Sequence, residues 1–325
     1  MTRYASEQVR MKNVSTGHFP LWCWIVFGAT ALALLVLDLL LHRGSGSRKR
    51  AIIWSVIWVS AGLAFGGFVW MNFGSPAAQD YLAAYLIEES LSLDNLFVFL
   101  IIFQSLKIPA NRQHEVLFWG ILGAVIFRAL FIFAGVRAIE RWEWVSFIFG
   151  AVLLYAAFRA FRDDPAKRHE NKLVAWLEQH LPVTQEPQGR KFIARQNGRR
   201  VATPLLIALI GIELSDIMFA IDSVPAVFSV SRTRFIIYSS NIFAILELRA
   251  LYLVLAQTIA RFKYLHYGLA GVLSFTGIKL IIERWVHIPS LLSIAVIGLI
   301  IGAAVWASLH AQSAQRTQSA PQHSP

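Results

Sequence analysis

Long apolar segments alternate with short polar ones over most of the sequence. A bilayer is crossed by about 20 consecutive apolar residues in a helix. Nine segments meet this length, and the pattern therefore predicts an all-α integral membrane protein with nine transmembrane helices: residues 21–41, 51–71, 81–104, 115–137, 144–161, 204–229, 236–257, 266–283 and 289–309.

The polar segments divide the chain further. Residues 1–20 form an extracytoplasmic amino-terminal segment in this interpretation, and residues 21–71 hold two peripheral spans. Residues 162–203 form a long basic loop that we expect at the cytoplasmic surface, near anionic lipid. The last span, 289–309, is followed by a tail, 310–325, whose Ser, Gln and Pro content predicts disorder.

Composition and charge agree with a membrane protein. Hydrophobic residues make up 56% of the chain and charged residues only 15%, against roughly 25% in a typical soluble protein. The net charge of +11 would favour nucleic acid as a partner of a soluble chain, but here it indicates basic loops on the cytoplasmic side. A single cysteine, Cys23, excludes an internal disulfide and a thiolate metal site.

The distribution of Lys and Arg also predicts the orientation. Most of them fall in the segments that lie inside when the amino terminus is outside, and Arg232 and Arg234 are the main exceptions. Because cytoplasmic loops carry an excess of Lys and Arg, we expect a multi-pass protein of the plasma or inner membrane with its carboxy terminus in the cytoplasm.

Two units of three spans, residues 81–161 and 204–283, resemble each other. Three short motifs recur in the same order, each at the same place in its span: Glu88–Asn95 with Asp216–Ser223, Phe127–Phe131 with Leu248–Tyr252, and Gly150–Arg159 with Ala270–Lys279. With three spans per unit, the second unit enters the membrane in the opposite sense. This is a 3+3 inverted-topology repeat, in which substrate sites lie near the midplane between the repeats.

The motifs place carboxylates where a bilayer offers no water. Each charged side chain at the bilayer centre costs about 2.5–3.5 kcal/mol on insertion scales. The six acids concerned must therefore be protonated, paired, hydrated or bound to cations: Glu88, Glu89, Asp94, Glu213, Asp216 and Asp222. Pairing with Arg128, Arg249 or Lys279 would neutralise some of them, but acids outnumber bases in these spans.

Oxygen ligands without Cys or in-span His suit hard divalent ions such as Mn²⁺, Mg²⁺ or Ca²⁺. We expect Asp94 and Asp222 to bind such an ion directly, with Glu88, Asp216 and Asn95 completing its shell. Glu89 and Glu213 could carry protons for exchange, and further oxygens come from Ser92, Ser223, Asn241 and Glu247. Arg159 and Lys279 end matched spans, where snorkelling is expected and gating is the alternative.

Helix geometry adds one condition. Residues six apart differ by about 120° in direction, so Glu88 and Asp94 do not share one face of a straight helix, and neither do Asp216 and Asp222. Either the helices are broken at the site or the polar groups face a cavity on two sides. Pro225 follows Asp222 closely and favours a break there.

At these residues the sequence resembles the TerC family of integral membrane proteins. The resemblance rests on "EESLSLDNLFVF", "VLFWGILGAVIFRALFIFAG", "ENKLVAWL" followed by "LPVT", "ATPLLIALIGIELSDIMFAIDSVPA" and "YSSNIFAILELRALY", between about Tyr81 and Lys279. It implies nine spans, an external amino terminus and efflux of a divalent metal, chiefly manganese. The chain departs from the family at Glu247, where Gly is usual, and at Thr233–Phe235, where an Asp-Pro pair is usual.

The function predicted from the sequence is therefore export of a divalent cation, Mn²⁺ first, by a protein that is not an enzyme and holds no tightly bound cofactor. Its expected partners are the lipid bilayer and the transported ion, with a soluble partner conceivable at residues 162–203. The alternative is a membrane anchor or scaffold of a tellurite-resistance or envelope-stress complex without transport activity.

Overall fold

A computed structural model describes residues 19–41, 48–142, 144–162, 176, 179, 191–196, 199–255, 265–286 and 288–318. In this part of the chain each predicted span falls on one long helix, with ends that differ by a few residues at most sites. The helices are α2 (Leu21–Leu41), α3 (Arg48–Phe73), α4 (Ser75–Ser105), α5 (Ala110–Arg141), α6 (Val145–Arg162), α8 (Pro204–Phe228), α9 (Arg234–Leu255), α10 (Leu265–Ile282) and α11 (Ser290–Gln318).

Helix starts coincide with residues that favour them. Gly74 takes a positive φ of 86°, which only glycine adopts easily, and turns the chain sharply from α3 into α4. Pro204 occupies the first turn of α8, where a missing N–H costs nothing. Pro109 and Pro289 immediately precede α5 and α11.

Six helices of the described residues are long and apolar enough to cross a membrane by length and composition, namely α3, α5, α6, α8, α9 and α11. Apolar stretches of α2 and α10 are shorter. Helix α4 is long enough, but it carries the acidic motif that begins at Glu88. That all nine helices cross the bilayer, and that the repeats are inverted, stay predictions.

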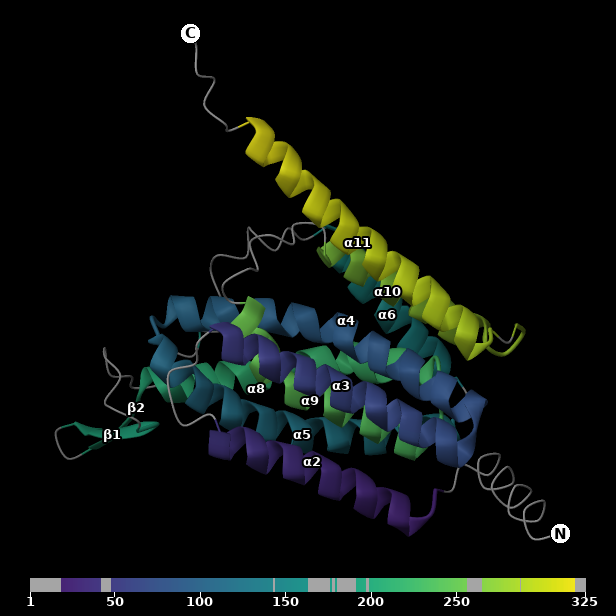
Figure 1. Cartoon of the computed structure of the whole chain (residues 1–325), viewed down its shortest axis with the longest axis horizontal. Helices are drawn as coiled ribbons and strands as arrows, with labels where there is room; N and C mark the ends of the chain where they lie inside the picture. Colours follow the sequence, from purple (N-terminus) through teal and green to yellow (C-terminus); the bar gives the residue numbers. More distant parts are fainter. Residues whose placement is uncertain are drawn as a thin grey trace.

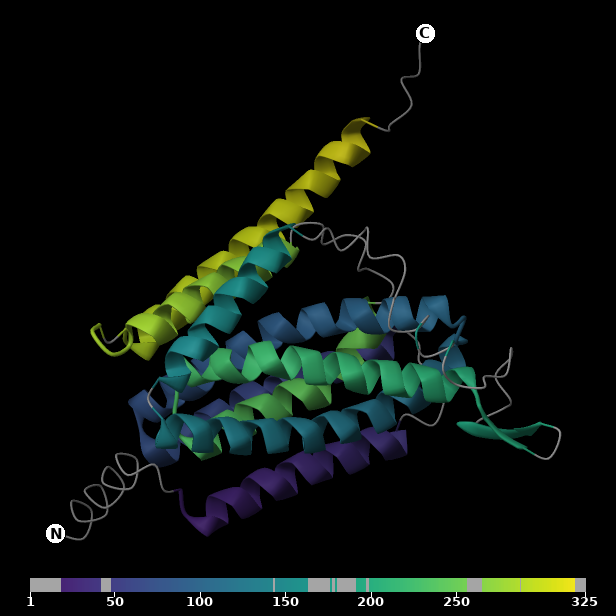
Figure 2. The same cartoon turned by 180° about the vertical axis from the view of Figure 1, so that it is seen from behind.

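The helices pack in a pattern that the predicted repeats would produce. Helix α6 packs on α10, α4 on α8 and α5 on α9, while α5 with α8 and α4 with α9 form a second matched set. An exchange of α4–α6 with α8–α10 would produce this pattern. Helices α2 and α11 lie at opposite sides of the bundle, and α11 lies with α6 and α10 in a group tilted against the rest (Figure 1, Figure 2).

The apolar core is divided in two. One cluster contains Phe65, Tyr81, Ile132 and Phe235, and the other contains Trp58, Phe103, Leu117 and Leu205. Each of α4, α5, α8 and α9 begins in one cluster and ends in the other. The change falls between Leu91 and Leu96 on α4 and between Ile212 and Ala220 on α8, so it overlaps each acidic motif in part. We call the polar residues around this change, from Glu88 to Asn95 on α4 and from Glu213 to Ser223 on α8, the polar layer.

The structure decides against one of the two alternatives for α8 and adds an element to the basic loop. Helix α8 is not broken beside Asp222, because it continues through Pro225 to Phe228, and a proline so near the helix end leaves few later turns to disturb. The described part of the basic loop contains two strands that the sequence analysis did not predict. Strands β1 (Ile193–Gln196) and β2 (Arg199–Ala202) form an antiparallel hairpin that projects from the end of the bundle where α8 begins (Figure 2).

Candidate functional site

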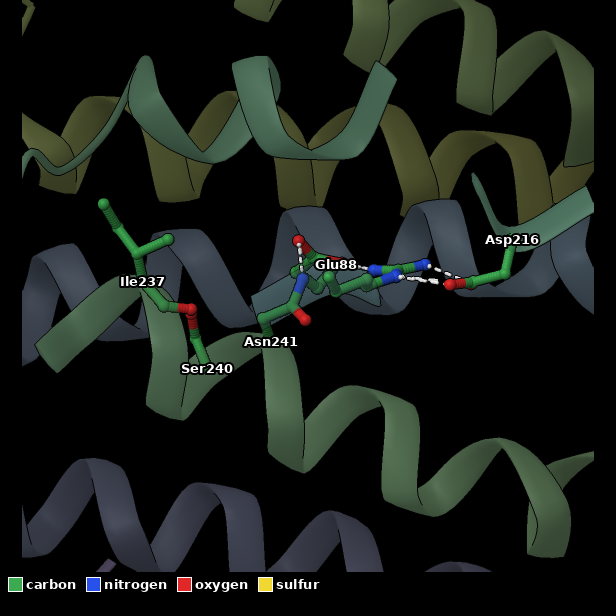
Figure 3. Close-up of polar contacts among 6 residues, drawn as sticks. Glu88, Asp216, Ile237, Ser240 and Asn241 are labelled. Carbon is green, nitrogen blue, oxygen red and sulfur yellow. Dashed lines mark hydrogen bonds and ion pairs between the residues drawn. The ribbon is translucent and has the colours of Figure 1, made fainter. Parts of the chain in front are cut away.

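Arg128 of α5 connects the acidic motifs of the two repeats. Its Nη1 donates to Glu88 Oε2 of α4 at 2.6 Å, and its Nη2 donates to Asp216 Oδ1 of α8 at 3.0 Å. Its Nε lies 3.3 Å from both oxygens of Asp216. Asn241 of α9 donates from Nδ2 to Glu88 Oε1 at 2.5 Å. These four residues, which we call the central ion network, join four helices (Figure 3).

The central ion network is fully buried and sets two carboxyl groups against one guanidinium. Glu88 is 0% exposed, and Arg128, Asp216 and Asn241 are each 1% exposed. Two carboxylates face one guanidinium, so the described network carries one negative charge when all three are ionised. A buried charge is costly unless it is paired and hydrogen-bonded. The guanidinium fork satisfies this condition because it binds one carboxylate on each side.

A second polar group lies on the side of α4 that faces α3 and α9. Tyr85 donates its hydroxyl hydrogen to Glu247 Oε2 of α9 at 2.8 Å. Glu89 lies one turn after Tyr85 on the same face of α4, and its carboxyl group interacts electrostatically with that of Glu247. We call Glu89 and Glu247 the acid pair. Gly62 of α3 leaves room for the Tyr85 ring beside the acid pair, because a Cβ at Gly62 would lie 2.7 Å from that ring.

A glycine of a neighbouring helix also leaves space for the side chain of Glu213 of α8. Its carboxyl oxygens lie so close to Gly123 of α5 that any Cβ at that position would overlap them. Its Oε2 is buried and finds no hydrogen-bond partner among the described residues. Asp216 lies one turn further along α8, so Glu213 borders the central ion network.

Other polar groups of the layer are buried and unsatisfied. Asn95 is 0% exposed, and neither atom of its amide has a hydrogen-bond partner in the described part of the chain. The hydroxyl oxygens of Ser92 and Ser223 are also buried and have no hydrogen-bond partner among the described residues. An unsatisfied buried group costs about 1–3 kcal/mol. These buried groups are therefore included in the candidate site.

The two aspartates predicted as direct ligands are only partly placed. Asp94 belongs to α4, but its side chain lies outside the described residues; Asp222 lies on α8 with a half-buried side chain that has a partner of its own. Among the described side chains, no three Asp, Glu, His or Cys converge on one point. Whether Asp94 and Asp222 hold one ion together therefore stays a prediction.

The remaining basic residues differ in their surroundings. Arg249 is buried on α9 and has a partner, and Arg159 is exposed at the end of α6. Lys279 is only 2% exposed, so it does not snorkel to the interface, and its Nζ donates to Ser293 Oγ of α11 at 2.9 Å. It borders a cavity of about 490 Å³ that is also lined by Asp80 and Glu283.

Three residues at the site escaped the sequence analysis. Tyr85 has the spacing that could have revealed it, because it lies four residues before Glu89 and therefore on the same face of α4. Gly62 and Gly123 gave no such signal. Their role is to leave space for a side chain of a different helix, and sequence alone does not show which helices meet.

The fold and site together define a class: a multi-pass, all-helical membrane protein with paired, buried charges at the middle of its bundle. The family described as "Integral membrane protein TerC family" matches residues 73–317, and the chain belongs to it. It is 44% identical over 291 residues to an uncharacterized membrane protein of Myxococcus xanthus, covering 88% of this chain and 91% of the relative.

Two further relatives are similar to the chain over most of their length. The chain is 40% identical over 288 residues to a protein of Escherichia coli (strain K12) named "Putative membrane-bound redox modulator Alx", covering 84% of this chain and 90% of that protein. It is 39% identical over 278 residues to an uncharacterized membrane protein of Rickettsia conorii, covering 84% and 92%. No solved structure matches the chain.

Proposed function

We propose that the chain exports a divalent cation, Mn²⁺ in the first place, through the polar layer at the middle of the membrane. One observation carries the proposal. The layer contains buried polar groups without hydrogen-bond partners among the described residues, at Asn95, Ser92, Ser223 and Glu213, between two apolar clusters. Carboxylate, amide and hydroxyl oxygens are ligands for hard divalent cations.

Arg128 has a structural role in this proposal. A fixed guanidinium between Glu88 and Asp216 neutralises part of the charge and links the two repeats. The acids outside the central ion network are the ones that interact with the ion. In this proposal Asp94 and Asp222 bind the cation, with the amide of Asn95 beside them, and Arg128 holds α4, α5 and α8 in register.

The test is cellular manganese content under Mn²⁺ load, measured in cells that lack the protein and express one variant each. Asp222→Asn keeps the size of the side chain but removes a charge that a divalent cation needs. We expect it to raise cellular manganese to the level of cells without the protein, while it still reaches the membrane. Glu140→Gln is the matched control, because Glu140 is 51% exposed and pairs with Arg234 far from the layer.

A second variant separates transport from folding. Asn95→Leu removes a buried amide whose two atoms have no described partner, so the free energy of unfolding should rise or stay equal. Manganese export should nevertheless be lost. A variant that exports normally would contradict a role for this amide in the cation path.

The scaffold alternative and a redox role predict different outcomes. A scaffold acting through residues 162–203 requires that deletion of "ENKLVAWL" abolish function while Asp222→Asn has no effect. A redox role, which the name of Alx suggests for that relative, has little support in the chain's own thiol chemistry. Its single cysteine, Cys23, is buried at 0% exposure and cannot form an internal disulfide.

A further inference from the structure

We infer that the acid pair, Glu89 and Glu247 with the hydroxyl of Tyr85, is a second binding site for a hard divalent cation, separate from the site at Asp94 and Asp222. The inference does not depend on the proposed transport path. It begins from the hydrogen bond that joins Tyr85 of α4 to Glu247 of α9, with Glu89 four residues after Tyr85 on the same face of α4.

The acid pair has no basic partner. Among the described residues, the interactions of Glu89 and Glu247 are with each other, with Tyr85 and electrostatically with Glu88 and Tyr81, and none is with Lys or Arg. This contrasts with Glu88, one residue earlier, which binds Arg128. Two like charges in contact repel, so a further positive charge is required to hold both ionised.

Unsatisfied oxygens point to a ligand at this place. Glu247 is 1% exposed, and its Oε1 has no hydrogen-bond partner among the described residues. Oε1 of Glu89 is likewise buried and without such a partner. A proton between the carboxyl groups would still leave one negative charge beside the rings of Tyr81 and Tyr85. A divalent cation would neutralise both carboxylates and use the free oxygens as ligands.

The surroundings fit a built site. Tyr81 donates its hydroxyl to the backbone oxygen of Gly62 at 3.0 Å, and the rings of Tyr81 and Tyr85 stack with their centroids 6.1 Å apart. This stacking fixes the Tyr85 hydroxyl toward Glu247. The site thus has three oxygen-bearing side chains, Tyr85 and Glu89 of α4 and Glu247 of α9. Helix α3 packs beside them at Gly62.

The experiment counts Mn²⁺ ions bound to the full chain in detergent, by the loss of the free-ion signal in electron paramagnetic resonance. We expect Glu247→Gln to bind one Mn²⁺ fewer per chain than the wild type, and Tyr85→Phe to keep the number but bind that ion more weakly. Asp222→Asn should lose a different ion. Glu140→Gln, an exposed control, should match the wild type.

The outcomes separate this inference from the proposed function. If Glu247→Gln binds as many ions as the wild type, the second site does not exist and a shared proton remains as the arrangement at the pair. If Glu247→Gln loses one ion while Asp222→Asn loses none, the second site stands and the proposed transport site fails.

A third variant covers the case in which Glu247→Gln does not fold. Gly62→Ala would push the ring of Tyr85 away from Glu247 without changing any charge, so it should weaken binding of the same ion. Gly67→Ala lies on the same helix with open space around it and is its control. Equal Mn²⁺ binding by the two alanine variants would overturn the inference.

Discussion

Arg128→Gln should destabilise the protein far more than the same change at an exposed ion pair. Arg128 is 1% exposed, and its removal leaves Glu88 and Asp216 buried without the cation that holds them. Removal of one partner from a buried ion pair costs about 3–5 kcal/mol. We expect a loss at the upper end of this range, because two carboxylates, not one, lose their partner.

Arg234→Gln is the matched comparison. Arg234 Nη2 lies 2.6 Å from Glu140 Oε2, the same separation as between Arg128 and Glu88, but the two side chains are 46% and 51% exposed. Such surface pairs contribute about 0–1 kcal/mol. Distance is thereby held constant while burial changes, so the difference between the two variants measures the effect of burial.

Asp216→Asn gives the opposite charge change at the same place. It reduces the two carboxylates facing Arg128 to one, so the described network becomes neutral instead of carrying a negative charge. We expect a small loss or a gain in stability. The assay is reversible unfolding by sodium dodecyl sulfate in mixed micelles, without divalent cations. The reasoning is refuted if Arg128→Gln and Arg234→Gln lose the same free energy, or if Asp216→Asn costs as much as Arg128→Gln.

Two further predictions concern Gly123, which leaves space for Glu213, and the orientation of the chain in the membrane. Gly123→Ala should displace the carboxyl group of Glu213 and lower manganese export in the cellular assay, whereas Gly28→Ala, which meets open space, should export normally. In a cysteine-free background, a cysteine at Asn72 should react with an impermeant thiol reagent added outside intact cells, and one at Gln312 should react only after lysis. Labelling of Gln312 from outside would contradict the orientation.

The positions of the helices could be predicted from the sequence because bilayer length and apolar composition act locally. Each predicted segment, such as 21–41 or 144–161, falls on one helix. Helix α4 was also found from its sequence, although its acids keep it out of a strict hydropathy criterion. The hairpin at Ile193–Ala202 was missed, since its strands are short and lie in a polar, basic segment without clear alternation.

The site was predicted in its residue types but not in its pairing. The acids and Arg128 stood out because charge inside a span is expensive. Which carboxylate Arg128 would bind, and that Lys279 would turn inward to Ser293, depended on helix packing that no local pattern records. Glu247 was noted as a departure from the family, but its contact with Glu89 joins residues far apart in the sequence.

The continuous course of α4 resolves the problem that its acids point in different directions. Neighbouring residues on a helix differ by about 100°, so Glu88 turns to Arg128 on α5 while Glu89 turns to Glu247 on α9. Helix α4 packs against α3, α8 and α9, so polar partners are available on more than one side and no break is needed. The two apolar clusters lie on either side of the polar layer along α4, α5, α8 and α9. If the chain exports an ion through this layer, as we propose, the helices have to separate at one cluster at a time, and we expect that movement at the matched contacts between α4–α6 and α8–α10.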